Sequence, residues 1–424
     1  MDAGAISKRY RNLVLAMLLL VYTLNYLDRQ IVGILAQAIK KDLDLSDSQL
    51  GLLGGFAFAL FYSLLGIPIA RLADRFNRTR IVTIALVAWS TFTGLCGLAG
   101  GFPSLFLARL GVGVGEAGGI APSFSLLSDY FPPNRRARAM AILTLGLPFG
   151  SAFGLLIGGF LAKDYGWRSA FLVMGCIGLA IAPIFFLIVR EPRRGQLDTA
   201  PPASGPVPSL GAVFRAVSTM PTFWFVSLGS ATASMLTYGF SFWLPAFMQR
   251  SHGLDLSTTA QFLAAIALTG GVAGTLLGGF LSDHLGKADR RAYVYVPAAA
   301  FAIALPALLL GVSAGSLPLV FVLLLIPQAT GYIWTGPCVA VIQNIAPPAM
   351  RTTASALYLF IVNFIGLGIG TLLFGMLSDI YTSQYGESAL RYSILTIGVV
   401  LYPLTVILFV TAGRTIIRDM PARD

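Results

Sequence analysis

The stretch LVLAMLLLVYTLNYLDRQIVGILA, from Leu13 to Ala36, decides the fold class because it is almost entirely apolar. A helix of about 20 apolar residues spans a lipid bilayer, so this stretch is long enough to cross one. Asp28 and Arg29 nevertheless lie side by side in its second half. Charges at the centre of a bilayer are costly and usually mark a functional site. The stretch therefore predicts a transmembrane helix that carries chemistry.

Apolar stretches of similar length recur along the chain of 424 residues, of which 56% are hydrophobic and 11% charged. Soluble domains have about 25% charged residues, so this composition excludes a water-soluble protein. We predict an all-α integral membrane protein with twelve transmembrane helices, the first a retained helix because no small-residue cleavage site follows it. Their approximate limits are 12–37, 47–70, 79–99, 103–129, 137–162, 168–190, 219–249, 257–282, 292–312, 317–346, 352–378 and 389–413.

Lysine and arginine residues are distributed unequally between the two sides of the membrane. With the N-terminus inside, the inner segments hold 21 of the 29 basic residues and the outer loops hold 6. Cytoplasmic loops carry such an excess, so we expect both termini in the cytoplasm. The net charge of +11 follows from this topology and from anionic lipid, and it requires no nucleic-acid partner.

Residues that bind metals or act in catalysis are sparse. Cys96, Cys176 and Cys338 lie far apart in apolar stretches, with neither metal-ligand spacing nor a disulfide framework. The two histidines, His252 and His284, lie in loop-like sequence, and no serine–base arrangement is evident. We therefore expect no metal, no cofactor other than a proton as coupling ion, and no enzymatic activity.

The chain contains two halves that resemble each other. SLLSDYFPPNRRARAMAIL (Ser125 to Leu143) parallels AVIQNIAPPAMRTTASALY (Ala340 to Tyr358), with a proline pair and an arginine at an offset of 215 residues. Duplicated six-helix halves suit a transporter in which one half pivots on the other around a midplane site. EPRRGQLDTAPPASGPVPS, Glu191 to Ser209, has the composition of a linker. The predicted domains are an N-terminal six-helix bundle (1–190), a cytoplasmic linker (191–215) and a C-terminal six-helix bundle (216–424).

Four charged residues are predicted inside the membrane, all in the N-terminal half. Arg109 and Glu116 are two helical turns apart, so they share one helix face about 10 Å apart along the axis. We expect Asp28 to face the same cavity, with Arg29 turned to another helix or toward substrate. Burial disfavours a charged carboxylate and a nearby arginine favours it, so a conformational change can load or release a proton. We predict Asp28 and Glu116 as proton-coupling residues and Arg109 as their modulator; the alternative is a structural ion pair.

Two loops that follow helix ends are predicted to act as gates, ARLADRFNRTR (Ala70 to Arg80) and GGFLSDHLGK (Gly278 to Lys287). Asp74 can accept hydrogen bonds from the N-terminus of a neighbouring helix, where the dipole favours an anion. The arginines of the first loop can pair with Asp129 or lie on lipid phosphate, and remaking such contacts interconverts two states. A loop that only sets the topology is the alternative. The predicted gating residues are Asp74, Arg75, Arg78, Arg80, Asp129, Arg138, Asp283 and Asp379.

These motifs resemble those of the major facilitator superfamily. Both loops resemble its signature small-x-[LF]-x-D-R-x-G-R, with Ala70 and Asn77 replacing the two glycines in the first, and RLGVGVGEAG resembles its fourth-helix motif. With NYLDRQIVG, FYSLLGIPIARLADRFNRTRIV and SLLSDYFPP, they are similar to the spinster branch. The resemblance implies two pseudo-symmetric six-helix bundles, alternating access, a bacterial inner membrane and a monomer. It also implies a lipid substrate, because that branch is associated with sphingosine-1-phosphate export and lysophospholipid transport.

The predicted spans seven to eleven hold no charge between their ends and carry aromatic residues instead. A cavity with charge on one wall and aromatic side chains on the other suits an amphiphile, with a polar head and an apolar tail. Placement of the aromatic residues at the membrane surface is the alternative. The predicted substrate-binding residues are Arg29, Tyr26, Tyr238, Trp243, Trp334, Tyr358 and Asn363.

The sequence thus predicts a proton-coupled secondary active transporter of an amphiphilic, lipid-like substrate, with membrane lipids as further partners. A proton-coupled symporter of small organic anions is the alternative, because such symporters carry a similar NYLDR-like first helix. A channel is not expected, since the sequence shows neither a filter-like loop nor rings of charge.

Overall fold

The computed structural model of the protein describes residues 7–197, 209–347 and 350–420, and within them every regular element is a helix. The predicted all-α class is thereby confirmed. Ten candidate spans in these ranges are long and apolar enough to cross a membrane, against twelve predicted. One of them, Arg351–Asp419, covers the predicted spans 352–378 and 389–413. The predicted span 219–249 corresponds to the 32-residue helix Pro221–His252, which is not among the ten.

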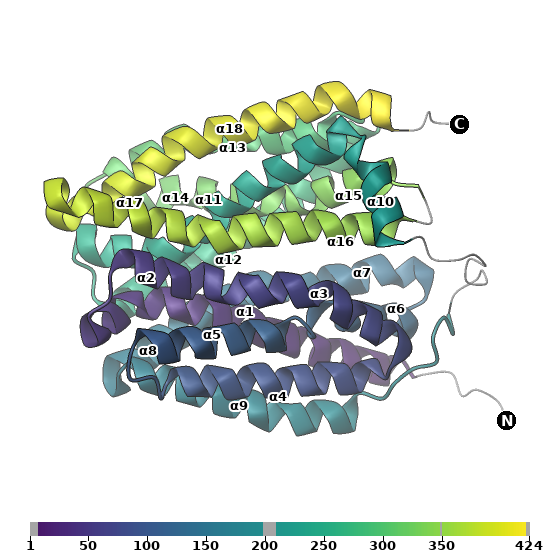
Figure 1. Ribbon diagram of the computed structural model, residues 1–424, viewed down its shortest axis with the longest axis horizontal. Coiled ribbons are helices and arrows are strands. Elements are labelled where there is room, and N and C mark those ends of the chain that lie inside the picture. The colour runs from purple at the N-terminus through teal and green to yellow at the C-terminus, as the bar shows by residue number, and fades with distance from the viewer. Residues whose placement is uncertain (1–6, 198–208, 348–349, 421–424) are drawn as a thin grey trace. The chain divides into compact units, whose positions relative to one another are not determined.

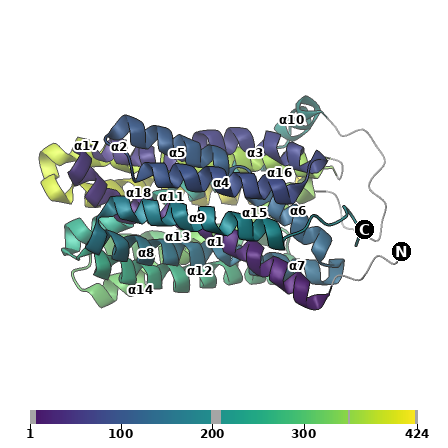
Figure 2. The same cartoon turned by 90° about the horizontal axis from the view of Figure 1, so that it is seen from below.

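The helices divide into two compact units, and the first consists of Met1–Leu43 and Leu60–Gly205. Its helices are α1 (Lys8–Leu43), most of α3 (Ala57–Arg75), α4 (Arg78–Cys96), α5 (Phe102–Glu116), α6 (Ile120–Tyr130), α7 (Pro133–Thr144), α8 (Gly146–Tyr165) and α9 (Trp167–Ile188). α1 packs against α8, and α4 packs against α5 and α9, beside which it runs in Figures 1 and 2. α8 lies so close to α1 at Gly150 that an added Cβ atom there would be only 2.6 Å from the Cβ atom of Tyr26. Small residues give membrane helices this close approach.

The second unit consists of Asp44–Ala59 and Pro206–Asp424. Its helices are α2 (Asp47–Gly51), η1 (Leu52–Phe56), α10 (Leu210–Ser218), α11 (Pro221–His252), α12 (Leu256–Gly286), α13 (Ala292–Ser313), α14 (Leu317–Ile333), α15 (Thr335–Ile345), α16 (Arg351–Ile361), η3 (Val362–Ile369), α17 (Gly370–Tyr385), η4 (Gly386–Ser388) and α18 (Ala389–Asp419). α11 and α13 both pack against α18, and α12 packs against α14. Ser209 caps α10 by accepting a hydrogen bond from the Ala212 amide, so a helix begins inside the predicted linker 191–215.

One segment of the second unit comes from the first half of the sequence. Within Asp44–Ala59, α2 packs against α17, and η1 contacts both η3 and α17. The Thr371 hydroxyl donates a hydrogen bond to the Gly51 carbonyl at 2.9 Å. Both η1 and η3 are π-helices, which occur frequently at functional sites. The predicted domain 1–190 assigns this segment to the N-terminal bundle, whereas its packing assigns it to the second unit.

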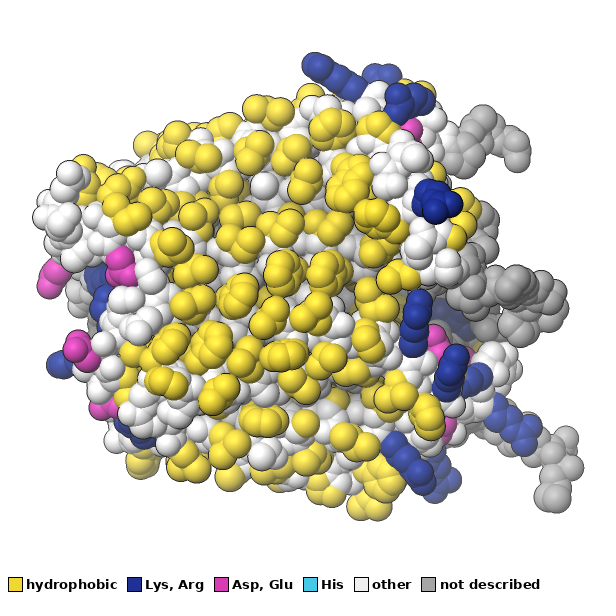
Figure 3. Space-filling view, viewed as in Figure 1, with side chains coloured by type: hydrophobic (Ala, Val, Ile, Leu, Met, Phe, Trp, Pro, Cys, Tyr) yellow, Lys and Arg dark blue, Asp and Glu magenta, His cyan; other side chains and the backbone are white. Residues whose placement is uncertain are grey.

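The outer surface of the helices is apolar. Figure 3 shows one face on which hydrophobic side chains cover most of the helix surface and charged side chains lie near helix ends. Exposed residues of this kind occur in both units, among them Leu187 (77% exposed) and Phe280 (67% exposed). Large continuous apolar surfaces are unusual on soluble proteins and mark contact with a membrane or partner. The apolar surface therefore agrees with the ten candidate membrane spans that helix length and composition indicate in the described residues.

Candidate functional site

The four charges predicted inside the membrane lie together in the first unit. Asp28 and Arg29 are carried by α1, and Arg109 and Glu116 are carried by α5. Asp28, Arg109 and Glu116 are 3%, 1% and 0% exposed, so water does not solvate them. The apolar sequence continues without a break on both sides of Asp28 and Arg29. The two charges therefore lie in the middle of α1 rather than at one of its ends. Buried charges of this kind need partners or a function.

Arg29 and Glu116 form a buried ion pair. The Arg29 Nε atom donates to Glu116 Oε2 at 2.8 Å, and the two side chains are 7% and 0% exposed. The guanidinium also lies over the rings of Tyr26 and Tyr62, 4.8 Å and 4.7 Å from their centroids. Such stacking stabilises a desolvated cation. The sequence predicts Arg29 turned to another helix or toward substrate, and in the structure it binds Glu116 of another helix, α5.

Asp28 belongs to the same electrostatic group. Thr93 of α4 donates a hydrogen bond to Asp28 Oδ2 at 3.3 Å. Asp28 Oδ1 has no hydrogen-bond partner among the described residues, and Glu116 and Arg109 act electrostatically on this carboxyl. Arg29 and Arg109 in turn act on Glu116. Arg109 therefore acts on both acids and Arg29 acts on Glu116, and because the two acids also act on each other, the protonation of one depends on the other.

The aromatic residues predicted to bind substrate lie in two kinds of environment in the second unit. Trp243 and Tyr358 are fully buried: Trp243 Nε1 donates to the Thr371 carbonyl at 2.8 Å, and the Tyr358 hydroxyl donates to Ser230 Oγ at 2.9 Å. Trp334 is 6% exposed, whereas Tyr238 and Asn363 are half-buried. Tyr26 lies in the first unit beside Arg29. The first two side chains complete the packing of their own unit, and a substrate role for the set stays a prediction.

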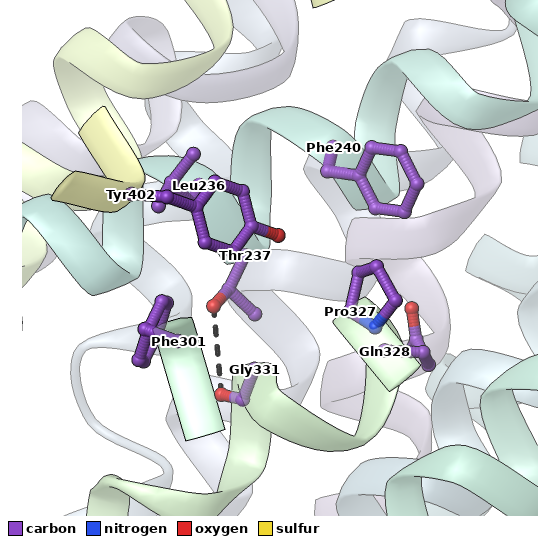
Figure 4. A pocket seen from close by; sticks show the side chains of 8 residues that line it. All are labelled: Leu236, Thr237, Phe240, Phe301, Pro327, Gln328, Gly331 and Tyr402. Atoms are coloured by element: carbon purple, nitrogen blue, oxygen red, sulfur yellow. Dashed lines mark hydrogen bonds between the residues drawn. The ribbon is translucent and has the colours of Figure 1, made fainter. Parts of the chain in front are cut away.

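A small cavity in the second unit is lined by residues that the sequence analysis missed. It has a volume of about 10 Å³, room for about one water molecule. Figure 4 shows the aromatic rings of Phe240, Phe301 and Tyr402 around it, with Thr237 donating to the Gly331 carbonyl at 3.5 Å. Its other lining residues are Leu236, Pro327 and Gln328. Gln328 gives the one sequence signal, a polar side chain inside the apolar stretch LLLIPQATG.

Arg78 is the centre of the first predicted gate. It is 1% exposed and forms an ion pair with Asp129, as the sequence analysis expects, and a second one with Glu191 at 2.7 Å. The Gly195 amide donates to Asp129 at 3.0 Å. Glu191 was missed because it belongs to the predicted linker, more than 100 positions away in sequence. A gating role for this network stays a prediction.

The other predicted gating residues of the two loops and of α7 are exposed. Asp74 makes no hydrogen bond to a helix N-terminus within the described part of the chain, although its sequence position suggests one. Asp283 is also exposed, and it accepts a hydrogen bond from the Tyr293 hydroxyl at 3.0 Å. The exposed residues of the first loop and of α7 are Asp74, Arg75, Arg80 and Arg138.

A second charged network, missed in the sequence analysis except for Asp379, joins α2 to α11 and α17. Arg250 binds the buried Asp47 carboxylate with two hydrogen bonds of 2.6 Å and 2.7 Å. Ser378 donates to the same carboxylate at 2.6 Å. Asp379 accepts hydrogen bonds from the Asp47 and Ser48 amides at 3.0 Å and 2.7 Å, which caps the start of α2. We call these five residues the Asp47 network.

Asp47→Asn should destabilise the second unit. The substitution removes the negative partner of the Arg250–Asp47 ion pair, and removing one partner of a buried ion pair costs about 3–5 kcal/mol when burial is complete. Because the Arg250 side chain is 16% exposed, we expect a loss of about 2–3 kcal/mol in the free energy of unfolding. Chemical denaturation in detergent at pH 7 measures it. Burial and the charge of Arg391 lower the pKa of His252, so this neighbour of Arg250 is neutral there.

Asp44→Asn is the matched control, because Asp44 is exposed and lies three positions from Asp47. Its positive φ of 49° is a conformation that asparagine also adopts. We expect a change below about 0.5 kcal/mol for this surface substitution. Equal effects of the two variants would contradict the importance of the Asp47 network.

Comparison with known proteins places these features in a family. The family model of the Major Facilitator Superfamily matches residues 18–371. An MFS-type efflux pump of Mycolicibacterium smegmatis is 33% identical over 403 residues, which cover 95% of this chain and 92% of the pump. A hexuronate transporter of Bacillus subtilis is 27% identical over 376 residues, which cover 86% of this chain and 87% of that protein.

A solved structure agrees with the fold as well. The crystal structure of a bacterial homologue of the human lysosomal transporter spinster, inward-facing and unoccupied, matches with a TM-score of 0.89. It is 32% identical in sequence, and the match covers 99% of this chain and 100% of that one. The predicted resemblance to spinster proteins is thus confirmed, and membership of a transporter family agrees with the prediction that the protein is not an enzyme. The chain belongs to the major facilitator superfamily of multi-pass membrane transporters, with a spinster homologue among its relatives.

Proposed function

We propose that the protein is a proton-coupled secondary active transporter of an amphiphilic, lipid-like substrate that works by alternating access. The observation that carries this proposal is the buried pair of Arg29 and Glu116, with Asp28 and Arg109 in the same electrostatic group. Asp28 and Glu116 carry protons, and Arg109 modulates them. A purely structural ion pair would not need a second acid, with one oxygen unpartnered among the described residues, beside it.

Arg29 supplies the link between substrate and proton. Its guanidinium suits a phosphate or carboxylate, which it binds with two parallel hydrogen bonds. When a substrate anion takes Arg29, Glu116 loses its closest counter-charge while it stays fully buried. A buried carboxylate without a counter-charge is neutralised by a proton rather than left ionised. Binding of an anion and uptake of a proton are thereby coupled.

An amphiphile is favoured over other anions by the apolar character of the second unit and by the relatives. The predicted spans seven to eleven of that unit hold no charge between their ends and carry aromatic residues instead. Two relatives are named an efflux pump and a homologue of spinster. The excess of basic residues in inner segments supports a bacterial inner membrane with both termini in the cytoplasm. We further propose that the protein acts as a monomer surrounded by membrane lipids.

A proton-coupled symporter of small organic anions is the second candidate. The observation in its favour is the hexuronate transporter of Bacillus subtilis among the relatives, since a hexuronate is a small carboxylate. Arg29 suits a carboxylate as well as a phosphate. The two candidates differ in the tail of the substrate, not in the proton site.

Flux into proteoliposomes distinguishes the candidates. The purified protein is reconstituted, a pH gradient is imposed, and uptake of labelled lysophosphatidylcholine is compared with uptake of labelled glucuronate, each with and without a protonophore. We expect gradient-dependent flux of the lysolipid and background flux of glucuronate. The opposite pattern supports the anion symporter, and gradient-independent flux of both contradicts proton coupling. Asp42→Asn, which changes an exposed carboxylate on α1, is the control variant.

A further inference from the structure

The small cavity of the second unit lies beside an interruption in the hydrogen bonding of α14. Pro327 lies inside this helix, and proline has no amide hydrogen with which to continue the helical hydrogen bonds. Gly331 lies in the last turn of α14, where the carbonyl groups have no amide partner within the helix. Both residues line the cavity. Unsatisfied backbone groups are costly inside a membrane, and α14 belongs to the candidate span Leu317–Ile345.

The Gly331 carbonyl is only weakly satisfied by the side chain nearest to it. The Thr237 hydroxyl of α11 lies 3.5 Å away, beyond the usual range of about 2.5–3.0 Å for such a bond. The same hydroxyl donates to the Ala233 carbonyl at 2.8 Å. A threonine hydroxyl has a single hydrogen to donate, so the shorter bond takes it. The Gly331 carbonyl can therefore accept a stronger hydrogen bond from the cavity.

Two other polar side chains of the cavity have unused hydrogen-bonding groups. The Gln328 amide of α14 and the Tyr402 hydroxyl of α18 form no hydrogen bond within the described residues, although the two residues are only 8% and 3% exposed. Figure 4 shows both side chains around the cavity, together with Thr237 and the Gly331 carbonyl. An amide and a hydroxyl can each donate and accept. The cavity thus brings together polar groups from α11, α14 and α18.

A single water molecule fits this set of groups. The cavity volume of about 10 Å³ holds about one water. Apolar cavities stay dry, whereas a buried water needs about two to four polar partners, which this lining supplies. A metal cation fits less well, because none of the lining residues, all of which the structure describes, carries a charge that would offset the loss of hydration.

We propose that the cavity is the binding site of one ordered water molecule. The water donates its two hydrogens to the Gly331 carbonyl and to Thr237 Oγ1, and it accepts from the Tyr402 hydroxyl and from Gln328 Nε2. It thereby joins the end of α14 to α11 and α18, close to the proline that interrupts the helix. Ordered waters are one means by which membrane helices tolerate proline. The inference concerns the second unit and does not depend on the proton site proposed in the first.

Hydroxyl-radical footprinting of the purified full-length protein tests for this water. An X-ray pulse produces radicals from water, and a radical formed from a bound water oxidises the aromatic rings beside it. We expect oxidation of Phe301 and Tyr402, which line the cavity although they are only 1% and 3% exposed. Phe223 and Phe247 are internal controls, because they are equally buried and do not line the cavity. Mass spectrometry of proteolytic fragments measures the oxidation, and both controls should remain unmodified.

Variants of the lining identify the cavity as the source of the radicals. Gln328→Leu keeps a similar volume and removes the polar group, so it should reduce the oxidation of Phe301 to the level of Phe223. Tyr402→Phe removes one hydroxyl and should reduce it less. Gln261→Leu makes the same chemical change at an exposed site of α12 and should leave the oxidation of Phe301 unchanged.

The comparison of rings within the unmodified protein does not require any variant to fold. If Phe301 and Tyr402 are as unreactive as Phe223, the inference is overturned. It is also overturned if folded Gln328→Leu shows the same oxidation of Phe301 as the unmodified protein. Oxidation that disappears when sodium chloride replaces choline chloride in the buffer would show that a cation takes the cavity instead of water.

Discussion

Flux driven by a pH gradient should fall to the level of protein-free vesicles when Glu116 is replaced by glutamine, and likewise when Asp28 is replaced by asparagine. Each substitution keeps the size of the side chain and removes its ability to bind and release a proton. Both residues are almost fully buried in the first unit, so no solvated acid can take over their task. The measurement is uptake of labelled lysophosphatidylcholine, or of glucuronate if that is the substrate, into proteoliposomes with an imposed pH gradient.

Exchange without a gradient separates coupling from folding. A variant that folds and binds substrate should still exchange labelled for unlabelled substrate across the membrane, since exchange needs no net proton movement. Asp42→Asn makes the same chemical change on the same helix, at an exposed site paired with Arg168, and should retain full gradient-driven flux. Wild-type flux in both Glu116→Gln and Asp28→Asn would remove these acids from the coupling mechanism.

Arg78→Ala is expected to cause the largest loss of stability. Arg78 binds Asp129 and Glu191 and also donates to Ser125 Oγ at 3.0 Å and to the Pro192 carbonyl at 3.3 Å. Without it, two carboxylates remain near each other with no counter-charge, and Asp129 is only 5% exposed. Removing one partner from a buried ionic network typically costs about 3–5 kcal/mol. Denaturation in detergent, followed by circular dichroism, measures this loss.

Arg80→Ala provides the matched control, because Arg80 lies two positions away and is exposed. We expect it to change the free energy of unfolding by less than about 0.5 kcal/mol. Arg78→Lys keeps the charge but cannot reach several acceptors at once, so an intermediate loss is expected. If Arg78→Ala were as stable as Arg80→Ala, the ion pairs of Arg78 would not stabilise the protein. The predicted gating role of Arg78 would then lose its structural support.

The helical fold was predictable because apolar length alone identifies membrane spans. The continuous stretch around Asp28 is one such case, and α1 covers it without interruption. The association of Asp44–Ala59 with the second unit was not predictable, since the sequence around it reads as an ordinary span. Its partners, among them Thr371 and Arg250, lie about 200 or more positions away in the chain. Contacts at that separation depend on tertiary packing, about which hydropathy carries no information.

The charges of the site were predictable, whereas their partners were only partly so. A charge inside an apolar stretch stands out, which is why Asp28, Arg29, Arg109 and Glu116 were all found. Their spacing on two separate helices does not determine which acid meets which arginine, so the pairing of Arg29 with Glu116 was not predicted. For Trp243 and Tyr358 the sequence did not reveal the role, because an aromatic residue in a span suits a packed core and a substrate cavity equally well. In the structure both side chains are buried and hydrogen-bonded within the second unit.

The helix that runs from α2 through η1 into α3 belongs at its start to one compact unit and at its end to the other. The boundary between the two units falls between Ala59 and Leu60, shortly after η1 (Leu52–Phe56). A π-turn closes its hydrogen bonds over five residues and is rarer than an α-turn, and it often lies at a functional site. Gly55, where a side chain would strike Thr371 and Leu367, leaves that turn unobstructed. The change from one unit to the other thus falls within a few residues of the predicted second span, shortly after a π-helical turn.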